Sequence, residues 1–251
     1  MPGTGSAQPL ISCIVPACNY GRFISQALDS ILAQTYRPIE IVVVDAGSTD
    51  NTREVVAGYG GAVRYVYQPD LAPAQARNAG IGLAQGEFVA FLDADDIWRP
   101  DKLARQLARF AARPELGYCI THVQMFWSKS LAGVADRMRS HPRAQPVPGY
   151  ATVTLLARRE LFETVGLLNP ALWSADSVDW FLRAAEMGVP MELLPDVLVY
   201  RRMHGDNLTR RKEHAFRREW LRFVKARLDK RRSSLAADLP GFVAPDFGVH
   251  E

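Results

Sequence analysis

The chain has 251 residues, of which 48% are hydrophobic and 23% charged, and its formal net charge is +3. This composition is that of a folded globular protein with a sizeable core, and it excludes a disordered chain. The three cysteines lack metal-ligand spacing, so neither a disulfide framework nor a zinc site is implied. Because the chain begins without a signal-peptide pattern and has no apolar run long enough for a membrane span, we expect a cytoplasmic location. We also expect no nucleic-acid partner.

Apolar runs and helix-like segments alternate along the first half of the chain. The runs lie at 11–15, 39–45, 63–67 and 87–92, and the segments at 22–34, 52–58, 73–85 and 101–112. This alternation predicts βαβ units and a mainly parallel sheet. Beyond residue 115 we expect strands at 117–127, 151–157 and 191–202, a proline-rich link at 142–148 and a helix at 178–187. The pattern favours one α/β domain in which these later elements continue the same sheet.

The sequence "FLDADD" places Asp93, Asp95 and Asp96 directly after a strand that reads as buried. Open α/β sheets bind ligands at this end of their strands, and carboxylates select Mg²⁺ or Mn²⁺ with a substrate phosphate completing the shell. The competing interpretation is a turn with helix capping. An EF-hand fails because Trp98 stands where its loop needs glycine. An Asp-nucleophile phosphatase is disfavoured because these acids follow the fourth strand.

Four segments together carry a family resemblance: "SCIVPACNYGRFISQALDSILAQTY", "IEIVVVDAGSTDNT", "AQARNAGIGLAQGEFVAFLDADDIWRPDKL" and "WFLRAAEMG". In this order and spacing they resemble family 2 glycosyltransferases of the GT-A fold. The resemblance implies inverting transfer of a sugar from a nucleotide-sugar donor, assisted by Mn²⁺ or Mg²⁺. It also implies a single GT-A domain. Residues 10–115 would form its nucleotide-sugar-binding half with a Rossmann-like sheet, and this sheet would continue into residues 116–209, the acceptor-binding half.

Matching positions suggest individual roles. Asp95 would ligate the metal, Asp93 would hold the ribose or the metal shell, and Asp96 would cap or orient. The remaining matches line the donor site: Pro16 and Ala17 after the first strand, Asp45 near base and ribose, Arg77 at the nucleotide or diphosphate, and His204 at the metal or diphosphate. Paired guanidinium donors suit phosphate oxygens, and imidazole is a common metal ligand. The simpler interpretations are an Arg77 paired with a nearby acid and a His204 on the surface.

Two positions depart from the family pattern. The second acid expected after strand 39–45 is Ala46, which puts base recognition in question. The expected Glu-Asp pair on the acceptor side reads Asp176-Ser177, and serine cannot act as the base unaided. Asp176 and Asp179 are therefore the candidate bases, and we favour Asp176. A catalytically silent nucleotide-sugar-binding or scaffold protein remains an alternative, as does a nucleotidyltransferase, although "PACNYGRF" is poor in glycine for the latter.

Residues 210–232 form a strongly basic segment, with 11 Lys and Arg against 3 Asp and Glu. An apolar stripe at helical spacing predicts an amphipathic helix. Its members are Phe216, Trp220, Phe223, Val224 and Leu228. We expect the stripe to pack mostly on the core. We expect the basic face to attract an anionic membrane surface or an acidic acceptor. Residues 1–9 and 233–251 are expected to be a disordered N-terminus and a C-terminal tail.

Overall fold

The computed structural model describes residues 8–138, 144–207 and 213–231. Its first half is a parallel sheet with strand order β3-β2-β1-β4. These strands are β1 (Ile11–Ala17), β2 (Ile39–Asp45), β3 (Arg64–Tyr67) and β4 (Phe88–Phe91), and the helices between and after them are α1 (Ile24–Leu32), α2 (Thr52–Ala57), α3 (Pro73–Leu83) and α4 (Lys102–Ala112). The predicted alternation is confirmed to within a few residues at each boundary.

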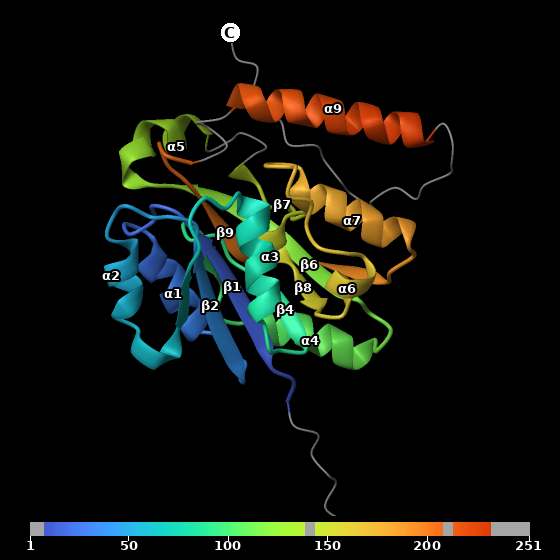
Figure 1. Ribbon diagram of the computed structural model, residues 1–251, viewed down its shortest axis with the longest axis horizontal. Coiled ribbons are helices and arrows are strands. Elements are labelled where there is room, and N and C mark those ends of the chain that lie inside the picture. Colours follow the sequence, from blue (N-terminus) through green and yellow to red (C-terminus); the bar gives the residue numbers. More distant parts are fainter. Residues whose placement is uncertain (1–7, 139–143, 208–212, 232–251) are drawn as a thin grey trace, which may run out of the picture.

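Helix α3, which contains Arg77, lies close against β1 (Figure 1). It begins with Pro73, which has no backbone N–H. This costs no hydrogen bond, because an N–H group in the first turn of a helix has no acceptor within the helix. Its close approach requires Gly80, because a Cβ at this position would lie 2.3 Å from Cγ2 of Ile14. Gly80 therefore allows α3 to pack closely on β1.

The second half extends the same sheet in the order β4-β8-β6-β9-β5. Its strands are β5 (Ile97–Trp98), β6 (Tyr118–Trp127), β7 (Val147–Pro148), β8 (Leu156–Arg158) and β9 (Met191–Met203). The short strand β8 is antiparallel to both β4 and β6, whereas the long strands β6 and β9 pair in parallel. The prediction of one continuous, mainly parallel sheet is therefore confirmed.

The prediction of a strand at 151–157 is wrong in its first part. Thr152–Thr154 form a short 3-10 helix, and only then does β8 begin. The Thr154 hydroxyl donates to the carbonyl of Gly149 and, at 2.9 Å, to that of Ala151, so the side chain turns the backbone instead of extending it. This 3-10 turn brings Thr152 and Val153 to the wall of the main cavity.

Three further helices belong to the second half of the chain: α5 (Ala132–Met138), α6 (Leu161–Thr164) and α7 (Asp176–Glu186). Helix α7 starts two residues earlier than the predicted 178–187, so Asp176 occupies its first turn. Figure 1 shows α9 (Glu213–Arg231) lying across this side of the molecule above α7. Within the part of the chain that is described, no helix has both the length and the apolarity of a membrane span.

Helix α9 buries only part of its predicted stripe. Phe216 and Trp220 are 2% and 6% exposed, and Phe223 is half-buried. Val224 and Leu228, in contrast, are 44% and 54% exposed. The expectation of a mostly buried stripe is thus wrong for the C-terminal half of the helix, which no element of the described residues covers.

Candidate active site

A cavity of about 840 Å³ opens at the carboxyl ends of β1 and β4. One wall comes from the loops that follow these strands, and the opposite wall comes from the turn at 150–153, the start of α7 and the inner face of α9. The sequence-predicted residues that line it are Pro16, Ala17, Arg77, Asp93, Asp95, Asp176 and His204. The fold therefore gathers residues spread over most of the chain at one place.

Asp95 lies at the centre of a small buried network. Its Oδ2 is 2.9 Å from Nε2 of His204 and accepts a 3.1 Å hydrogen bond from Nδ2 of Asn207. Its Oδ1 accepts no hydrogen bond from any described residue. The guanidinium of Arg202 donates to the Asp95 carbonyl, and the Arg202 backbone N–H donates to Asp96, so strand β9 fixes this acidic turn. The carboxylate is thus held by one oxygen while the other stays available.

The tautomer of His204 follows from its second nitrogen. Nδ1 accepts a hydrogen bond of 3.2 Å from the backbone N–H of Asp206. A nitrogen that accepts cannot also carry the proton of a neutral imidazole, so Nε2 carries it and donates to Asp95. His204 is 1% exposed, which excludes the simpler interpretation of a surface histidine.

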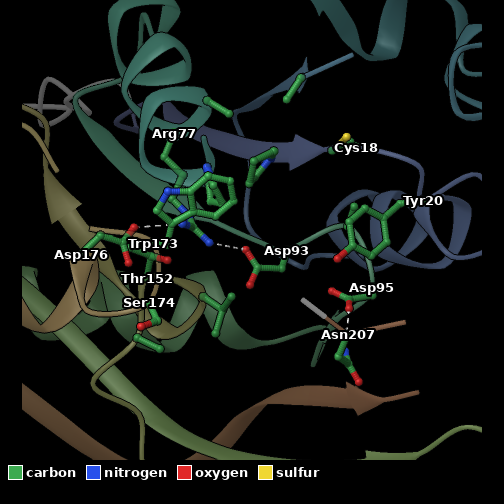
Figure 2. A pocket seen from close by; sticks show the side chains of 18 of the residues that line it. Cys18, Tyr20, Arg77, Asp93, Asp95, Thr152, Trp173, Ser174, Asp176 and Asn207 are labelled. Atoms are coloured by element: carbon green, nitrogen blue, oxygen red, sulfur yellow. Dashed lines mark hydrogen bonds and ion pairs between the residues drawn. The ribbon is translucent and has the colours of Figure 1, made fainter. Parts of the chain in front are cut away.

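Arg77 joins the two sides of the cavity (Figure 2). Nη2 donates to Asp93 at 2.7 Å, and Nη1 donates to Asp176 at 3.0 Å. Burial lowers the pKa of Arg77, but the carboxylates of Asp93 and Asp176 outweigh this effect and raise it. Its Nε is buried and has no hydrogen-bond partner among the described residues. The arginine thus binds one acid in the loop after β4 and one acid in the first turn of α7.

Asp176 is 3% exposed, and its two oxygens differ. Oδ2 accepts a hydrogen bond from Arg77, whereas Oδ1 has a long side-chain contact of 3.4 Å with the hydroxyl of Ser177, and the backbone N–H of Ser177 also interacts with the carboxylate. Burial raises the pKa of Asp176, and the nearby charge of Arg77 opposes this rise. The result is a carboxylate with one oxygen held and one oxygen open, in a site that favours taking up a proton.

Asp179 and Asp45 lie outside the lining of this cavity. The Asp179 carboxylate binds Arg183 at 2.8 Å and Arg227 at 3.3 Å on the other side of α7. Asp45 is fully buried, and its oxygens accept hydrogen bonds from Tyr65 and from the backbone N–H groups of Gly47 and Ser48. Asp45 therefore shapes the loop after β2, while its neighbour Ala46 lines the cavity.

A family model described as Glycosyl transferase family 2 matches residues 12–166, which is more than half of the chain. The chain belongs to glycosyl transferase family 2. An uncharacterized glycosyltransferase of Nostoc sp. strain PCC 7120, alr2836, is 33% identical over 217 residues, covering 78% of this chain and 66% of the relative.

Two solved structures resemble this family 2 chain. S. aureus TarS in complex with UDP has a TM-score of 0.61 at 21% identity, covering 77% of this chain and 60% of that one. The mannosyltransferase PcManGT from Pyrobaculum calidifontis, in complex with GDP-Man and Mn²⁺, has a TM-score of 0.63 at 26% identity, covering 82% and 61%. The fold is that of GT-A glycosyltransferases, as the sequence resemblance implied. The chain spans 60 to 66% of the length of these three proteins.

The structure also places in the site several residues of this family 2 chain that sequence reasoning missed. Asn207 binds Asp95, and its place three residues after His204 in "MHGDN" was the available signal. Phe216 and Trp220 line the cavity from α9, although the sequence treated them only as members of a packing stripe. Glu219, between them, had no sequence signal because its partners lie more than 40 residues away.

Proposed function

We propose that this protein is an inverting glycosyltransferase that moves a sugar from a nucleoside-diphosphate sugar to a hydroxyl or amine of an acceptor. The observation that carries the proposal is the cavity itself, in which Asp95 on the strand side and Asp176 on the helix side each present an open carboxylate oxygen. Family membership supports the reaction class. Arg77 binds both Asp93, two residues before Asp95, and Asp176, and so links the strand side to the helix side.

A divalent ion, Mn²⁺ or Mg²⁺, is proposed to bind at Asp95 through Oδ1. No group of three or more His, Cys, Asp and Glu residues in the described chain is arranged to hold an ion. One carboxylate still fits such an ion when the donor diphosphate supplies further ligands. When bound, the ion supplies Lewis acidity to the departing diphosphate. The hydrogen-bonding pattern supports His204 and Asn207 as donors that orient Asp95, in place of the direct ligand role expected for His204.

Asp176 is proposed as the base. Its open Oδ1 takes the proton from the acceptor hydroxyl as that oxygen forms a bond to the anomeric carbon. The bond from this carbon to the diphosphate oxygen breaks on the opposite face, so one displacement inverts the configuration. Because burial raises the pKa of Asp176, we expect the acid limb of the rate profile above the pH range of an ordinary aspartate.

Donor binding and its dependence on metal test the first part of the proposal. Calorimetric titration of a panel of nucleoside diphosphates with Mn²⁺ should find one that binds, and EDTA should abolish most of the heat. Asp95→Asn should remove the metal requirement together with most of the affinity. Glu115→Gln, at a surface carboxylate outside the cavity, is the matched control and should bind normally. Equal affinity of the wild type with and without EDTA would refute the metal role.

Two substitutions on α7 test the base. Asp176→Asn should lower turnover by about 10²- to 10⁴-fold while leaving donor binding nearly intact. Asp179→Asn should retain turnover because its carboxylate lies outside the cavity lining. The reverse result would move the base to Asp179. A protein that binds the donor but never hydrolyses it, even slowly in water, would be the silent binder that Ser177 raises as an alternative.

The outer face of α9 is proposed to contact an anionic surface. Leu221, Val224 and Leu228 are exposed on it, with Leu221 72% exposed. Arg218, Arg222 and Lys225 beside them are exposed too. Apolar anchors among basic side chains suit a membrane carrying anionic lipid, and the cytoplasmic location that the sequence predicts would offer such a leaflet.

Vesicle co-sedimentation tests this contact. Vesicles of phosphatidylcholine with phosphatidylglycerol should bind the protein at low salt, and pure phosphatidylcholine vesicles should not. Binding that persists at moderate salt and is lost in Leu221→Ser/Leu228→Ser would mean that the apolar side chains insert. Binding that is lost when salt is added would mean that the contact is electrostatic only. No sedimentation with anionic vesicles at low salt would refute the membrane contact.

A further inference from the structure

Helix α9 flanks the candidate base from a distant part of the chain. Trp220 packs in one apolar cluster with Ala175 and Val178, the residues on either side of Asp176 and Ser177. Together with Phe216, Trp220 also lines the cavity, so the inner face of α9 is a wall of the candidate active site. Figure 1 shows the helix lying directly over α7.

Glu219 links this wall to the segment that leads to the base. Its Oε1 accepts hydrogen bonds from the backbone N–H groups of Ser174 at 2.8 Å and Ala175 at 3.0 Å, and from the Ser174 hydroxyl at 2.9 Å. Its Oε2 accepts from the backbone N–H of Trp173 at 2.9 Å. One carboxylate thus receives four hydrogen bonds from three consecutive residues.

These backbone groups need an outside partner. They lie just before α7, where N–H groups have no acceptor within the helix, and the N-cap residue Ala175 has no side chain that could serve. A carboxylate satisfies them with charge-assisted hydrogen bonds and also interacts favourably with the positive end of the helix dipole. Glu219 therefore supplies, from another helix, the cap that the local sequence lacks.

We infer that Glu219 is a positioning residue for Asp176 and that α9 is part of the active site. The inference rests on the proposed function for the role of Asp176, which is the residue immediately after the clamped segment 173–175. Releasing these N–H groups to water lets the segment move relative to Arg77 and the acidic turn. Because proton transfer depends steeply on the distance between the reacting atoms, a small movement lowers turnover without altering the donor site.

A second anchor on α9 provides a matched control. Arg227 binds Glu186 and, at 3.3 Å, the carboxylate of Asp179, so it ties α9 to the far side of α7. Its hydrogen bonds go to Glu186 and Asp179 on α7, whereas those of Glu219 go to segment 173–175. Arg227→Gln therefore weakens the attachment of the helix while leaving the clamp at Glu219 intact.

The test compares Glu219→Gln, Glu219→Asp and Arg227→Gln with the wild-type chain. In Glu219→Gln we expect amide hydrogen exchange in segment 173–175 to become at least about tenfold faster, since its protecting charged acceptor is gone. Hydrolysis of the bound donor should show kcat lowered by about 10- to 100-fold with KM within about twofold, the pattern of a lost transition-state alignment. Glu219→Asp should recover part of kcat, and Arg227→Gln should match the wild type in both measurements.

Unchanged exchange in Glu219→Gln, or an equal loss of kcat in Arg227→Gln, would overturn the inference. A wild-type protein that neither binds nor hydrolyses any nucleoside-diphosphate sugar would instead refute the proposed function. The exchange measurement would still decide whether Glu219 holds segment 173–175, because it needs no substrate.

Discussion

The two walls of the cavity are built in different ways. We name the two walls after the function proposed above. The donor wall consists of loops that directly follow β1, β2 and β4, and hydrogen bonds between short side chains and the backbone join the first two of these loops repeatedly. The acceptor wall draws on the turn at 150–153, the start of α7 and the helix α9, which are far apart in the chain. A few long charged side chains, chiefly Arg77 and Glu219, hold these segments in place.

This contrast has an energetic consequence. Loss of one contact on the donor wall leaves several neighbours that still define the loop. Loss of Arg77 or Glu219 leaves buried charges or N–H groups without partners, and such groups cost far more than an average hydrogen bond contributes. We therefore expect a substitution on the acceptor wall to have a larger effect than a substitution on the donor wall.

The largest effect is expected for Arg77→Met. The side chains of Arg77 and Asp176 are only 10% and 4% exposed, so the substitution strands a carboxylate in a buried place. Breaking a buried pair in this way costs about 3–5 kcal/mol of the free energy of unfolding. Urea denaturation measures the loss. Arg77→Met/Asp176→Asn should restore part of it because the stranded charge is removed, and a double variant no more stable than the single one would contradict this account.

The donor wall was predictable from sequence because its determinants are local. Buried parallel strands read as continuous apolar runs, and the acids after a strand fall by topology at the ligand-binding end of the sheet. The positions of Asp93 and Asp95 at this end of the sheet could therefore be predicted from the sequence. The surroundings of Asp45 could not, because its partner Tyr65 comes from the neighbouring strand β3.

On the acceptor wall Asp176 was named from the sequence, but the contacts that hold this wall together were not, because they are long-range. Arg77 and Asp176 are 99 residues apart, and nothing in either neighbourhood indicates the pair. The turn at 152–154 was predicted as a strand because β-branched residues fill it, and the back-bonding of Thr154 overrode that propensity. The stripe on α9 was recognised, but periodicity does not show how far along the helix the core extends.

A second effect is expected at the seam between the two halves. Lys102 on α4 is fully buried and donates to Gln106 at 2.8 Å, and Gln106 in turn binds the carbonyls of Cys119 and Thr154 in the acceptor half. Burial lowers the pKa of Lys102 to about 7. The unfolded chain therefore binds more protons than the folded one between about pH 7 and its ordinary value of 10.5, and stability rises with pH across this window.

Lys102→Met tests that seam. The rise in the free energy of unfolding attributable to Lys102 between pH 7 and pH 10 should be on the order of 3 kcal/mol, and the variant should lack it. Parallel denaturation series at several pH values compare the two proteins. Lys225→Met, at an exposed lysine on α9, should keep the wild-type slope. Identical slopes in wild type and Lys102→Met would mean that the lysine titrates normally.

A smaller effect is expected for Asn19→Ala on the donor wall. The Asn19 side chain accepts hydrogen bonds from the backbone of Thr49 and Asp50, and its φ of 63° is one that alanine tolerates poorly. We expect a loss of about 1–2 kcal/mol, with Asn19→Gly losing less because glycine adopts this conformation freely. Donor affinity should change little, because the bonds made by Tyr20 and Gly21 remain. A loss of affinity as large as that of Asp95→Asn would show that this wall is not redundant.

The smallest effect is expected for labelling of the Cys18 thiol by a thiol reagent. Its thiol is exposed and lines the donor wall, whereas Cys13 and Cys119 are buried, so a thiol reagent should modify Cys18 first. Partial burial raises the pKa of Cys18, as do the charges of Asp45 and Asp50, which keeps the reaction slow at neutral pH. A nucleoside diphosphate bound with Mn²⁺ should slow labelling further in proportion to its occupancy. Labelling unaffected by saturating ligand would place the nucleotide away from the loop after β1, and the division of the cavity into a donor wall and an acceptor wall would have to be redrawn.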